Sequence, residues 1–277
     1  MSLAITLHTP PAVPLEAETL CPARLAGLSP DQVARRPVVH GNQAAELGEF
    51  FRVSGTANGE IHLEGDLSRV KRVGAGMTEG RIVIHGPVGM HLGAGMSGGE
   101  IIVEGDAGDW VGPEMTGGRI VIRGNAGHMV GSAPRGSAVG MRGGEIVVLG
   151  SVGNEAGSGM RRGVVAVGRD AGDFTGVNML AGTVVVLGRL GWRTGAGMKR
   201  GTIVSMEPAE LLPTFAYACT YRPVFLRLYL PHLRRLGLPV TDEQMTGRYQ
   251  RWSGDAVELN RGEILLLDSG PATRRAA

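Results

Sequence analysis

Short apolar strands recur at a regular spacing through the middle of this chain. Each repeat opens with a strand whose second and fourth residues are large and apolar, as in Ile82 and Ile84. Residues two apart lie on one face of a strand, so these side chains are predicted to point into a core. The repeat is 19 residues long and occupies residues 81–99, 100–118, 145–163, 164–182 and 183–201, with longer units at 60–80 and 119–144.

Glycine stands at two fixed positions of every repeat, and the chain has 46 glycines in all. A glycine at a fixed phase indicates a turn that needs positive φ, or a close approach between neighbouring backbones. Strands this short, separated by glycine turns, predict an all-β fold: a right-handed parallel β-helix of seven to eight coils. The two columns are Gly80, Gly99, Gly118, Gly144, Gly163, Gly182 and Gly201, and Gly74, Gly93, Gly112, Gly131, Gly157, Gly176 and Gly195.

A methionine follows the second glycine column in every repeat. Stacked methionines could form a soft-metal or redox conduit, but no Cys or His accompanies them. An unbranched side chain that fills an irregular corner of the core is the simpler interpretation. The column is Met77, Met96, Met115, Met141, Met160, Met179 and Met198.

The outward face of the predicted strands changes character along the chain. The first strand position alternates in charge in the early repeats, and each exposed pair of opposite charges contributes roughly 0.2–1 kcal/mol. The later repeats are apolar at outward positions such as Ala166, Val185 and Val204. An apolar sheet face must be covered, either by the C-terminal segment or by another protein of a complex. The alternating residues are Glu60, Arg81, Glu100, Arg119 and Glu145.

The texture of the sequence divides the chain into three parts. Residues 1–45 are predicted to be an irregular segment with a helix that begins at Ser29-Pro30, because Ser is a favoured N-cap and Pro suits the first turn. Residues 46–207 are predicted to form the β-helix. Residues 208–277 are predicted to be a mostly helical extension that packs on the β-helix or on a partner.

The extension contains prolines that interrupt its predicted helices. These are Pro213, Pro223 and Pro231. Residues 249–267 resemble a strand-turn-strand. The helical part is the candidate cover for the apolar outer face of the late coils.

Composition narrows the class of protein. Aromatic residues are only 4% of the chain, so the core is expected to be aliphatic, and the net charge of +2 is too small to indicate nucleic acid. No run approaches the ~20 apolar residues of a membrane span, and the N-terminus lacks the pattern of a signal peptide. Cys21 and Cys219 lie far apart, as is typical of a reduced protein. We expect a cytoplasmic protein that binds neither nucleic acid nor membrane.

Catalytic and metal-binding motifs are absent from this sequence. The histidines show no metal-ligand spacing, although His62 and His85 are expected to be neighbours on an outer strand face. Gly-x-Gly combinations follow the coil period rather than opening a helix, which argues against a dinucleotide site. We therefore predict no catalytic residues and no metal site on this chain.

Basic residues gather at one corner of the late coils, directly after the core methionines. This basic corner comprises Arg142, Arg161, Arg162, Lys199 and Arg200. A solvated edge that opposes aggregation is one interpretation. The other is a binding track for an anionic ligand or an acidic partner, because stacked like charges repel unless they are screened or paired.

The coil texture resembles the glycine-rich β-helix at the C-terminus of glutamate synthase large subunits and, more closely, the C subunit of formylmethanofuran dehydrogenase. The tail is similar to the bacterial branch of that family, the C subunit of the formyltransferase/hydrolase complex of methylotrophic bacteria. The segments outside the coils that carry the resemblance are Gly41-Asn42, residues 47–51, residues 212–215, Tyr221-Arg222-Pro223 and Trp252-Ser253-Gly254-Asp255.

This resemblance implies a scaffold role in tetrahydromethanopterin-dependent one-carbon metabolism, the oxidation of formaldehyde. In such a complex the amidohydrolase-like A subunit releases formate. The D subunit, a formyltransferase, moves formyl from formyl-tetrahydromethanopterin to a methanofuran-type carrier, and the B subunit completes the assembly. The carrier of the bacterial branch bears a polyglutamate chain, an anionic partner suited to the basic corner. No cofactor is implied as bound to this chain by itself.

Two other functions stay open at this stage. One is the C subunit of an archaeal-type tungsten or molybdenum formylmethanofuran dehydrogenase, whose redox centres lie on other subunits. The other is a free-standing β-helix enzyme acting on glycans, which would use clustered carboxylates. Asp106, Asp109 and Glu114 are the dense acidic group on one coil that could serve it.

Overall fold

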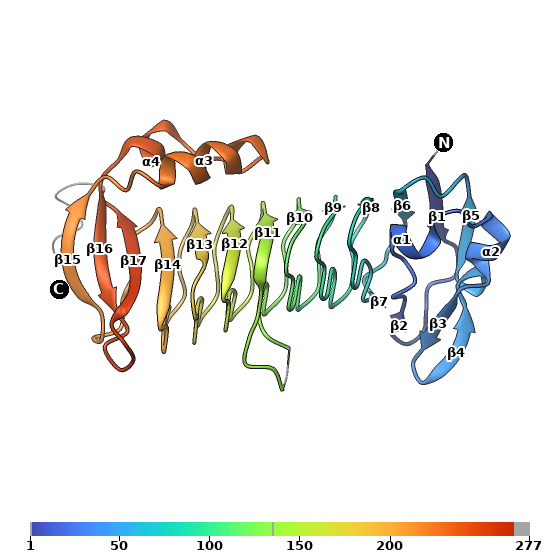
Figure 1. Ribbon diagram of the computed structural model, residues 1–277, viewed down its shortest axis with the longest axis horizontal. Helices are drawn as coiled ribbons and strands as arrows, with labels where there is room; N and C mark the ends of the chain where they lie inside the picture. Colours follow the sequence, from blue (N-terminus) through green and yellow to red (C-terminus); the bar gives the residue numbers. More distant parts are fainter. Residues whose placement is uncertain (1, 135, 269–277) are drawn as a thin grey trace.

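A computed structural model describes residues 2–134 and 136–268, which form an elongated row of strands (Figure 1). The main sheet has 13 strands in the order β15-β16-β17-β14-β13-β12-β11-β10-β9-β8-β6-β1-β5. The strands of the repeat pair in parallel with one another. They are β6 (Glu60–Glu64), β8 (Arg81–His85), β9 (Glu100–Val103), β10 (Arg119–Ile122), β11 (Arg142–Val148), β12 (Arg162–Val167), β13 (Thr183–Val186) and β14 (Arg200–Ser205).

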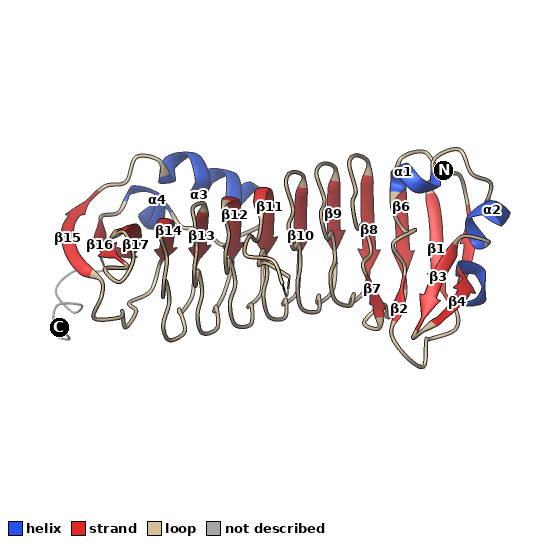
Figure 2. Cartoon of the chain, turned by 60° about the horizontal axis from the view of Figure 1, so that its bottom comes forward, coloured by secondary structure: helices blue, strands red, loops and turns tan. Residues whose placement is uncertain are grey.

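Successive repeats pair residue for residue. Ile101 of β9 lies between Ile82 of β8 and Ile120 of β10. The turns stack in the same order, because parallel bridges join Ala107 to both Val88 and Ala126. Each unit therefore pairs in parallel with its neighbours at two places, once through its strand and once through its turn (Figure 2). The fold is mostly β, with one large and mostly parallel sheet.

The inward strand residues and the methionine column share one continuous core. Every methionine of that column, from Met77 to Met198, is fully buried. The interpretation of the column as core is therefore confirmed. The aliphatic character of the core follows from the same cluster, in which Phe50, Phe51 and Phe215 are the buried aromatic residues.

The glycine columns combine positive φ with close contacts, as their fixed phase predicts. Gly93 has a φ of 62°, and a Cβ there would lie 2.6 Å from Cδ1 of Ile120. Gly99 has a φ of 80°, and a Cβ there would lie 2.7 Å from the carbonyl oxygen of Gly80. A larger side chain at either position would force neighbouring coils apart.

Side chains in the turns tie each coil to the next. The backbone N–H of His128 donates to Oδ1 of Asp109 at 2.7 Å, and the N–H of Asn154 donates to Nδ1 of His128 at 2.9 Å. The series continues from Asp173 N–H to Oδ1 of Asn154 at 3.0 Å and from Trp192 N–H to Oδ1 of Asp173 at 2.8 Å. This turn ladder pairs backbone N–H groups in the turns, which lie outside the hydrogen bonding of the strands.

The N-terminal segment contains regular elements that were not expected from the sequence. β1 (Leu3–Leu7) lies in the main sheet, parallel to β6 and antiparallel to β5 (Phe51–Ser54). A second sheet has the order β4-β3-β2-β7. Its strands are β2 (Leu15–Glu16), β3 (Pro37–His40), β4 (Gln43–Glu46) and β7 (Val70–Lys71).

Short helices complete this end of the molecule. They are α1 (Pro22–Leu25), α2 (Pro30–Ala34) and the 3-10 helix η1 (Leu47–Glu49). The predicted helix start at Ser29 is confirmed, because its side chain accepts from the N–H of Gln32 in a capping box. The expectation of an otherwise irregular segment is wrong, since the alternation of Leu3 and Ile5 places both side chains in the core.

The C-terminal extension holds both helices and strands, so the expectation of a mostly helical extension holds only in part. Its elements are β15 (Ala216–Tyr221), α3 (Leu226–Arg235), α4 (Asp242–Thr246), β16 (Tyr249–Gly254) and β17 (Arg261–Leu267). β16 and β17 form the expected strand-turn-strand as an antiparallel pair. β17 also pairs in parallel with β14, so a segment far from the repeats in sequence adds one more strand to the row.

Helix α3 lies across the outer face of the late coils (Figure 1). Its buried residues Leu226, Leu230 and Leu233 belong to a second hydrophobic cluster. That cluster includes Val147, Ala166, Val185 and Val204 from the outward side of the strands, all fully buried. α3 therefore supplies the cover that the apolar face requires. Within the described residues no helix is long and apolar enough to cross a membrane.

Candidate functional site

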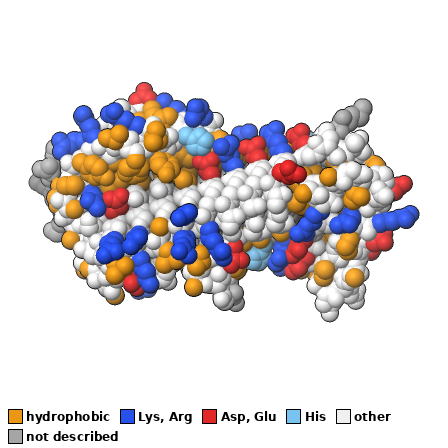
Figure 3. Space-filling view, viewed as in Figure 1, with side chains coloured by type: hydrophobic (Ala, Val, Ile, Leu, Met, Phe, Trp, Pro, Cys, Tyr) orange, Lys and Arg blue, Asp and Glu red, His pale blue; other side chains and the backbone are white. Residues whose placement is uncertain are grey.

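The basic corner lies where the late strands begin. Arg142, Arg162 and Arg200 are the first residues of β11, β12 and β14, while Arg161 and Lys199 directly precede such residues. The core methionine before each group points inward, so the following residues emerge at the surface. All five side chains are exposed. Lys and Arg atoms gather along this edge of the molecule (Figure 3).

The structure brings these residues together in two groups. Arg142 and Arg162 are partners in the parallel register, and the N–H of Arg161 donates to the carbonyl of Met141 in the preceding coil at 2.8 Å. Lys199 and Arg200 lie two coils further along the stack. Leu180 and Ala181 occupy the same corner in between, so the row of positive charge is interrupted there.

One further arginine joins the second group. Arg261 of β17 is the register partner of Arg200 and is also exposed. It was not among the residues expected from the sequence, because it lies outside the repeats. A local signal was present, since Arg261-Gly262-Glu263-Ile264 has the same pattern as Arg200-Gly201-Thr202-Ile203.

Few acids neutralise the basic corner. Nη2 of Arg142 lies 3.9 Å from Oε1 of Glu114, and Nζ of Lys199 lies 3.9 Å from Oε2 of Glu258. In the part of the chain that the structure describes, no acid forms an ion pair with Arg161, Arg162 or Arg200. Guanidinium groups can donate paired hydrogen bonds to carboxylates or phosphates. The arrangement can therefore attract an extended anion along an open edge.

The acidic group on coil 100–118 has structural partners. Oδ1 of Asp106 accepts from the N–H of Asn125 at 2.6 Å, and Asp109 begins the turn ladder. Glu114 forms the long ion pair with Arg142. Each carboxylate thus contributes to stacking or charge balance, and nothing in their contacts favours a glycan-cleaving site.

The histidine pair lies where the sequence predicts it. Nδ1 of His62 is 3.0 Å from Nε2 of His85, and the two rings stack with centroids 5.3 Å apart. Among residues 2–134 and 136–268, no group of three or more His, Cys, Asp or Glu side chains is arranged to hold a metal ion. Burial, with the nearby Arg72 and Lys71, lowers the pKa of a third histidine, His91.

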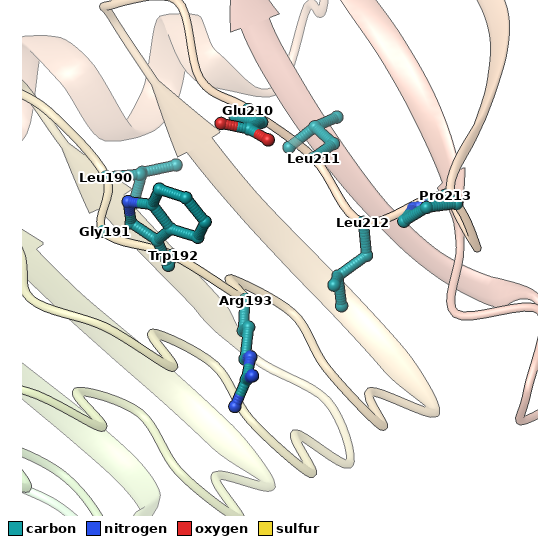
Figure 4. A pocket seen from close by; sticks show the side chains of 8 residues that line it. All are labelled: Leu190, Gly191, Trp192, Arg193, Glu210, Leu211, Leu212 and Pro213. Carbon is teal, nitrogen blue, oxygen red and sulfur yellow. The ribbon is translucent and has the colours of Figure 1, made fainter.

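A cavity of about 300 Å³ opens beside the turn of the last complete coil (Figure 4). Trp192 and Arg193 line it on one side, and Glu210, Leu211 and Leu212 line it on the other. The Trp192 side chain is 71% exposed. Nothing in the sequence singled out Trp192, because one tryptophan in a turn forms no motif. The cavity has the mixed apolar and charged lining of a contact site.

Known proteins share parts of this sequence. Residues 100–215 match a family model described as GXGXG motif. Over 82 residues the chain is 44% identical to the C subunit of the molybdenum-containing formylmethanofuran dehydrogenase 1 of Methanothermobacter thermautotrophicus, covering 29% of this chain and 20% of that protein. Over 95 residues it is 38% identical to the C subunit of the tungsten-containing formylmethanofuran dehydrogenase 2 of the same organism, covering 32% and 35%. The chain thus spans about a fifth to a third of these relatives.

A solved structure is similar over nearly the whole chain. It is the crystal structure of the formyltransferase/hydrolase complex (FhcABCD) from Methylorubrum extorquens in complex with methylofuran. The matching chain is 34% identical in sequence, with a TM-score of 0.89. The likeness covers 95% of this chain and 99% of the matching one. It therefore includes the flanking parts as well as the coils.

Proposed function

This chain belongs to the family formed by the C subunits of formylmethanofuran dehydrogenases, and from that premise we propose that it is a non-catalytic scaffold subunit of a bacterial formyltransferase/hydrolase complex. The observation that carries the proposal is the likeness to a chain of the Methylorubrum extorquens complex over 95% of this sequence. A likeness based only on the coil texture would have stopped at the repeats. The flanking parts, which lie outside the repeats, are included.

The proposal extends to the shape of the scaffold. We assign residues 46–207 to a right-handed parallel β-helix, with 1–45 and 208–277 as its flanking parts. The paired strands and stacked turns support the coil. The strong preference for right-handed connections between parallel strands of one sheet supports its hand. Such a body is stiff along its length, as suits a scaffold that holds other proteins apart.

The chemistry is assigned to the other subunits. The formyltransferase, or D subunit, would move formyl from formyl-tetrahydromethanopterin to a methanofuran-type carrier. The amidohydrolase-like A subunit would release formate, with the B subunit in the same assembly. These three are the partners that the proposal gives to this chain.

We assign the basic corner to the anionic polyglutamate of such a carrier. The matching complex is described with methylofuran bound. Arg161, Arg162 and Arg200 form no ion pair with a described acid, so they are available to carboxylates from outside the chain. A tethered carrier raises the effective concentration at the second active site.

A second candidate is the archaeal-type redox complex, which the identity of 44% to a molybdenum-containing relative favours. Metal analysis of the intact complex separates the two, because only the dehydrogenase carries molybdenum or tungsten on a partner. Cys21 and Cys219 are both free thiols, as is usual in a reducing compartment, and we assign either complex to the cytoplasm.

Native purification of the tagged full chain, followed by mass spectrometry, tests the assignment. Recovery of an amidohydrolase-like protein and a formyltransferase in fixed ratio, without molybdenum or tungsten, is the expected result. Recovery of the chain alone, free of other subunits at low ionic strength, would overturn the scaffold role. A polyglutamylated small molecule that co-purifies supports the carrier assignment.

A further inference from the structure

Helix α3 has a second face, which points away from the strands that it covers (Figure 1). Leu226, Leu230 and Leu233 face the sheet and are buried. Residues three and four apart share one side of a helix. The opposite side of the helix and the residues just before it carry a stripe that we call the outer stripe, formed by Val224, Arg227, Leu228, Pro231 and Arg235.

The outer stripe exposes large apolar side chains. Val224 is 72% exposed and Leu228 is 77% exposed, the highest values among the exposed large hydrophobic residues of the described chain apart from Val257. Pro231 stands one turn further along the same side. A proline has no N–H, so the carbonyl of Arg227 lacks its usual helical donor. Apolar surface thus lies beside a carbonyl that has lost its usual helical donor.

Arginines flank this apolar centre without partners of their own. No acid in residues 2–134 or 136–268 forms an ion pair with Arg227 or Arg235. Their neighbour Arg234 shows the contrast, because its Nη2 lies 2.9 Å from Oδ1 of Asp242 and its Nε donates to the carbonyl of Val240 at 2.7 Å. Arg234 holds α4 in place, whereas the two stripe arginines point to solvent.

We propose that the outer stripe is the docking surface for an acidic surface on another protein of the complex, one that carries carboxylates around an apolar centre. Arginine is enriched at protein–protein interfaces, and apolar side chains that lie together on a surface and are bordered by polar residues mark an interaction site. Charge complementarity selects an acidic partner. The inference rests on the proposed function and names the kind of contact that joins this chain to its complex.

A second copy of this chain does not fit the stripe. A two-fold interface would place the stripe against itself, so that Arg227 and Arg235 of both copies would meet with like charge. An anionic small molecule fits poorly as well, because Leu228 and Pro231 lie between the two cations and the exposed apolar side chains would stay in water. The stripe is also held rigidly, since α3 packs in a hydrophobic cluster. A rigid surface loses little freedom on binding.

The proposal is tested by the binding of the tagged full chain to the other subunits of the complex, which are purified together without this chain. The dissociation constant of this binding is measured by biolayer interferometry at low and high salt. The chains compared are the natural chain, Arg227→Glu/Arg235→Glu and Leu228→Ser. A double reversal at the other end of the molecule, Arg35→Glu/Arg52→Glu, is the control with the same change of net charge. All substituted side chains are exposed, and thermal unfolding verifies that each variant folds.

We expect Leu228→Ser to weaken binding about tenfold at both salt concentrations. The stripe reversal is expected to weaken binding at least tenfold at low salt and less at high salt, because salt screens the new repulsion between like charges, while the control stays within about twofold. Both stripe variants binding like the natural chain, or the control losing as much affinity, would overturn the inference alone. A natural chain that binds none of the other subunits would overturn the proposed function and this inference together.

Discussion

Nε2 of His232 lies 2.9 Å from Oε1 of Glu145 and 3.0 Å from Oε2, although 87 residues separate the two in sequence. Nε of Arg119 contacts the same carboxylate at 2.9 Å. Arg119 lies in turn 3.4 Å from Glu100, which pairs with Arg81 at 3.4 Å. The alternating row of charge predicted on the outer face is therefore confirmed, and it ends where the C-terminal half of α3 begins to cover the sheet.

Loss of the His232–Glu145 contact is expected to loosen α3. Replacement of His232 by Ala should lower the free energy of unfolding by about 1–2 kcal/mol, because the Glu145 carboxylate is largely buried and loses a partner. Urea denaturation of His232→Ala, Glu145→Gln and the double variant forms a double-mutant cycle. Strictly additive effects would contradict a direct interaction.

The repeats could be predicted because each one carries the same alternation of apolar strand residues and the same glycine positions. Ile82, Ile101 and Ile120 are inward for the same reason of alternation, so one unit predicts the others. β1 was missed because Leu3 and Ile5 form a single short alternation, and its place beside β6 depends on a contact across more than fifty residues. The His232–Glu145 pair is likewise a long-range contact that no local pattern encodes. The pairing of Arg200 with Arg261 is also long-range, but the pattern shared by residues 200–203 and 261–264 is a local signal for it.

Two glycines of the same coil separate backbone strain from crowding. Gly93 and Gly95 have φ of 62° and 64°, but a Cβ at Gly95 would meet nothing within 4 Å, whereas one at Gly93 would lie 2.6 Å from Ile120. Gly95→Ala should cost about 1–2 kcal/mol of unfolding free energy through positive φ alone. Gly93→Ala should cost a further ~1–3 kcal/mol through overpacking. Equal denaturation midpoints for the two variants would refute the crowding argument.

Stability in acid is expected to depend on Asp255, which is 4% exposed. Burial alone would raise the pKa of its carboxyl, but hydrogen bonds from the N–H groups of Val257 and Gly197 hold that pKa below its usual value. A lowered folded pKa contributes stability that is fully present above the unfolded pKa, about 3.9, and is lost as pH falls through the folded pKa.

Asp255→Asn should therefore be less stable than the natural chain at neutral pH, by about 1–3 kcal/mol. The difference should shrink below pH ~4 as the natural carboxyl takes up its proton. Urea midpoints measured at pH 7 and at about pH 3, below the unfolded pKa, check both statements. A difference that stays constant across that range would show that the charge of Asp255 contributes nothing.

The carrier assignment predicts a salt-sensitive interaction at the basic corner. Arg161→Glu/Arg162→Glu should lower the affinity for a synthetic polyglutamate about tenfold at low salt and much less at high salt, since exposed charges are screened. Fluorescence anisotropy with a labelled peptide measures it, and Arg35→Glu/Arg52→Glu is the matched control. Unchanged affinity would leave the corner as a solvated edge.

The turn ladder that runs from Asp109 to Trp192 has a consequence for how this chain can change length. Because each side chain reaches the backbone of the next coil, deletion of one whole unit such as 164–182 would let Asn154 meet Trp192 in place of Asp173. A deletion of one residue more or less would shift the two turns out of register at that junction unless a loop took up the difference, as one does between His128 and Asn154 in the longer unit 119–144. Length can therefore vary only in steps of one coil, about 4.8 Å each. The number of coils would therefore set the distance between proteins that bind at the two ends of the row.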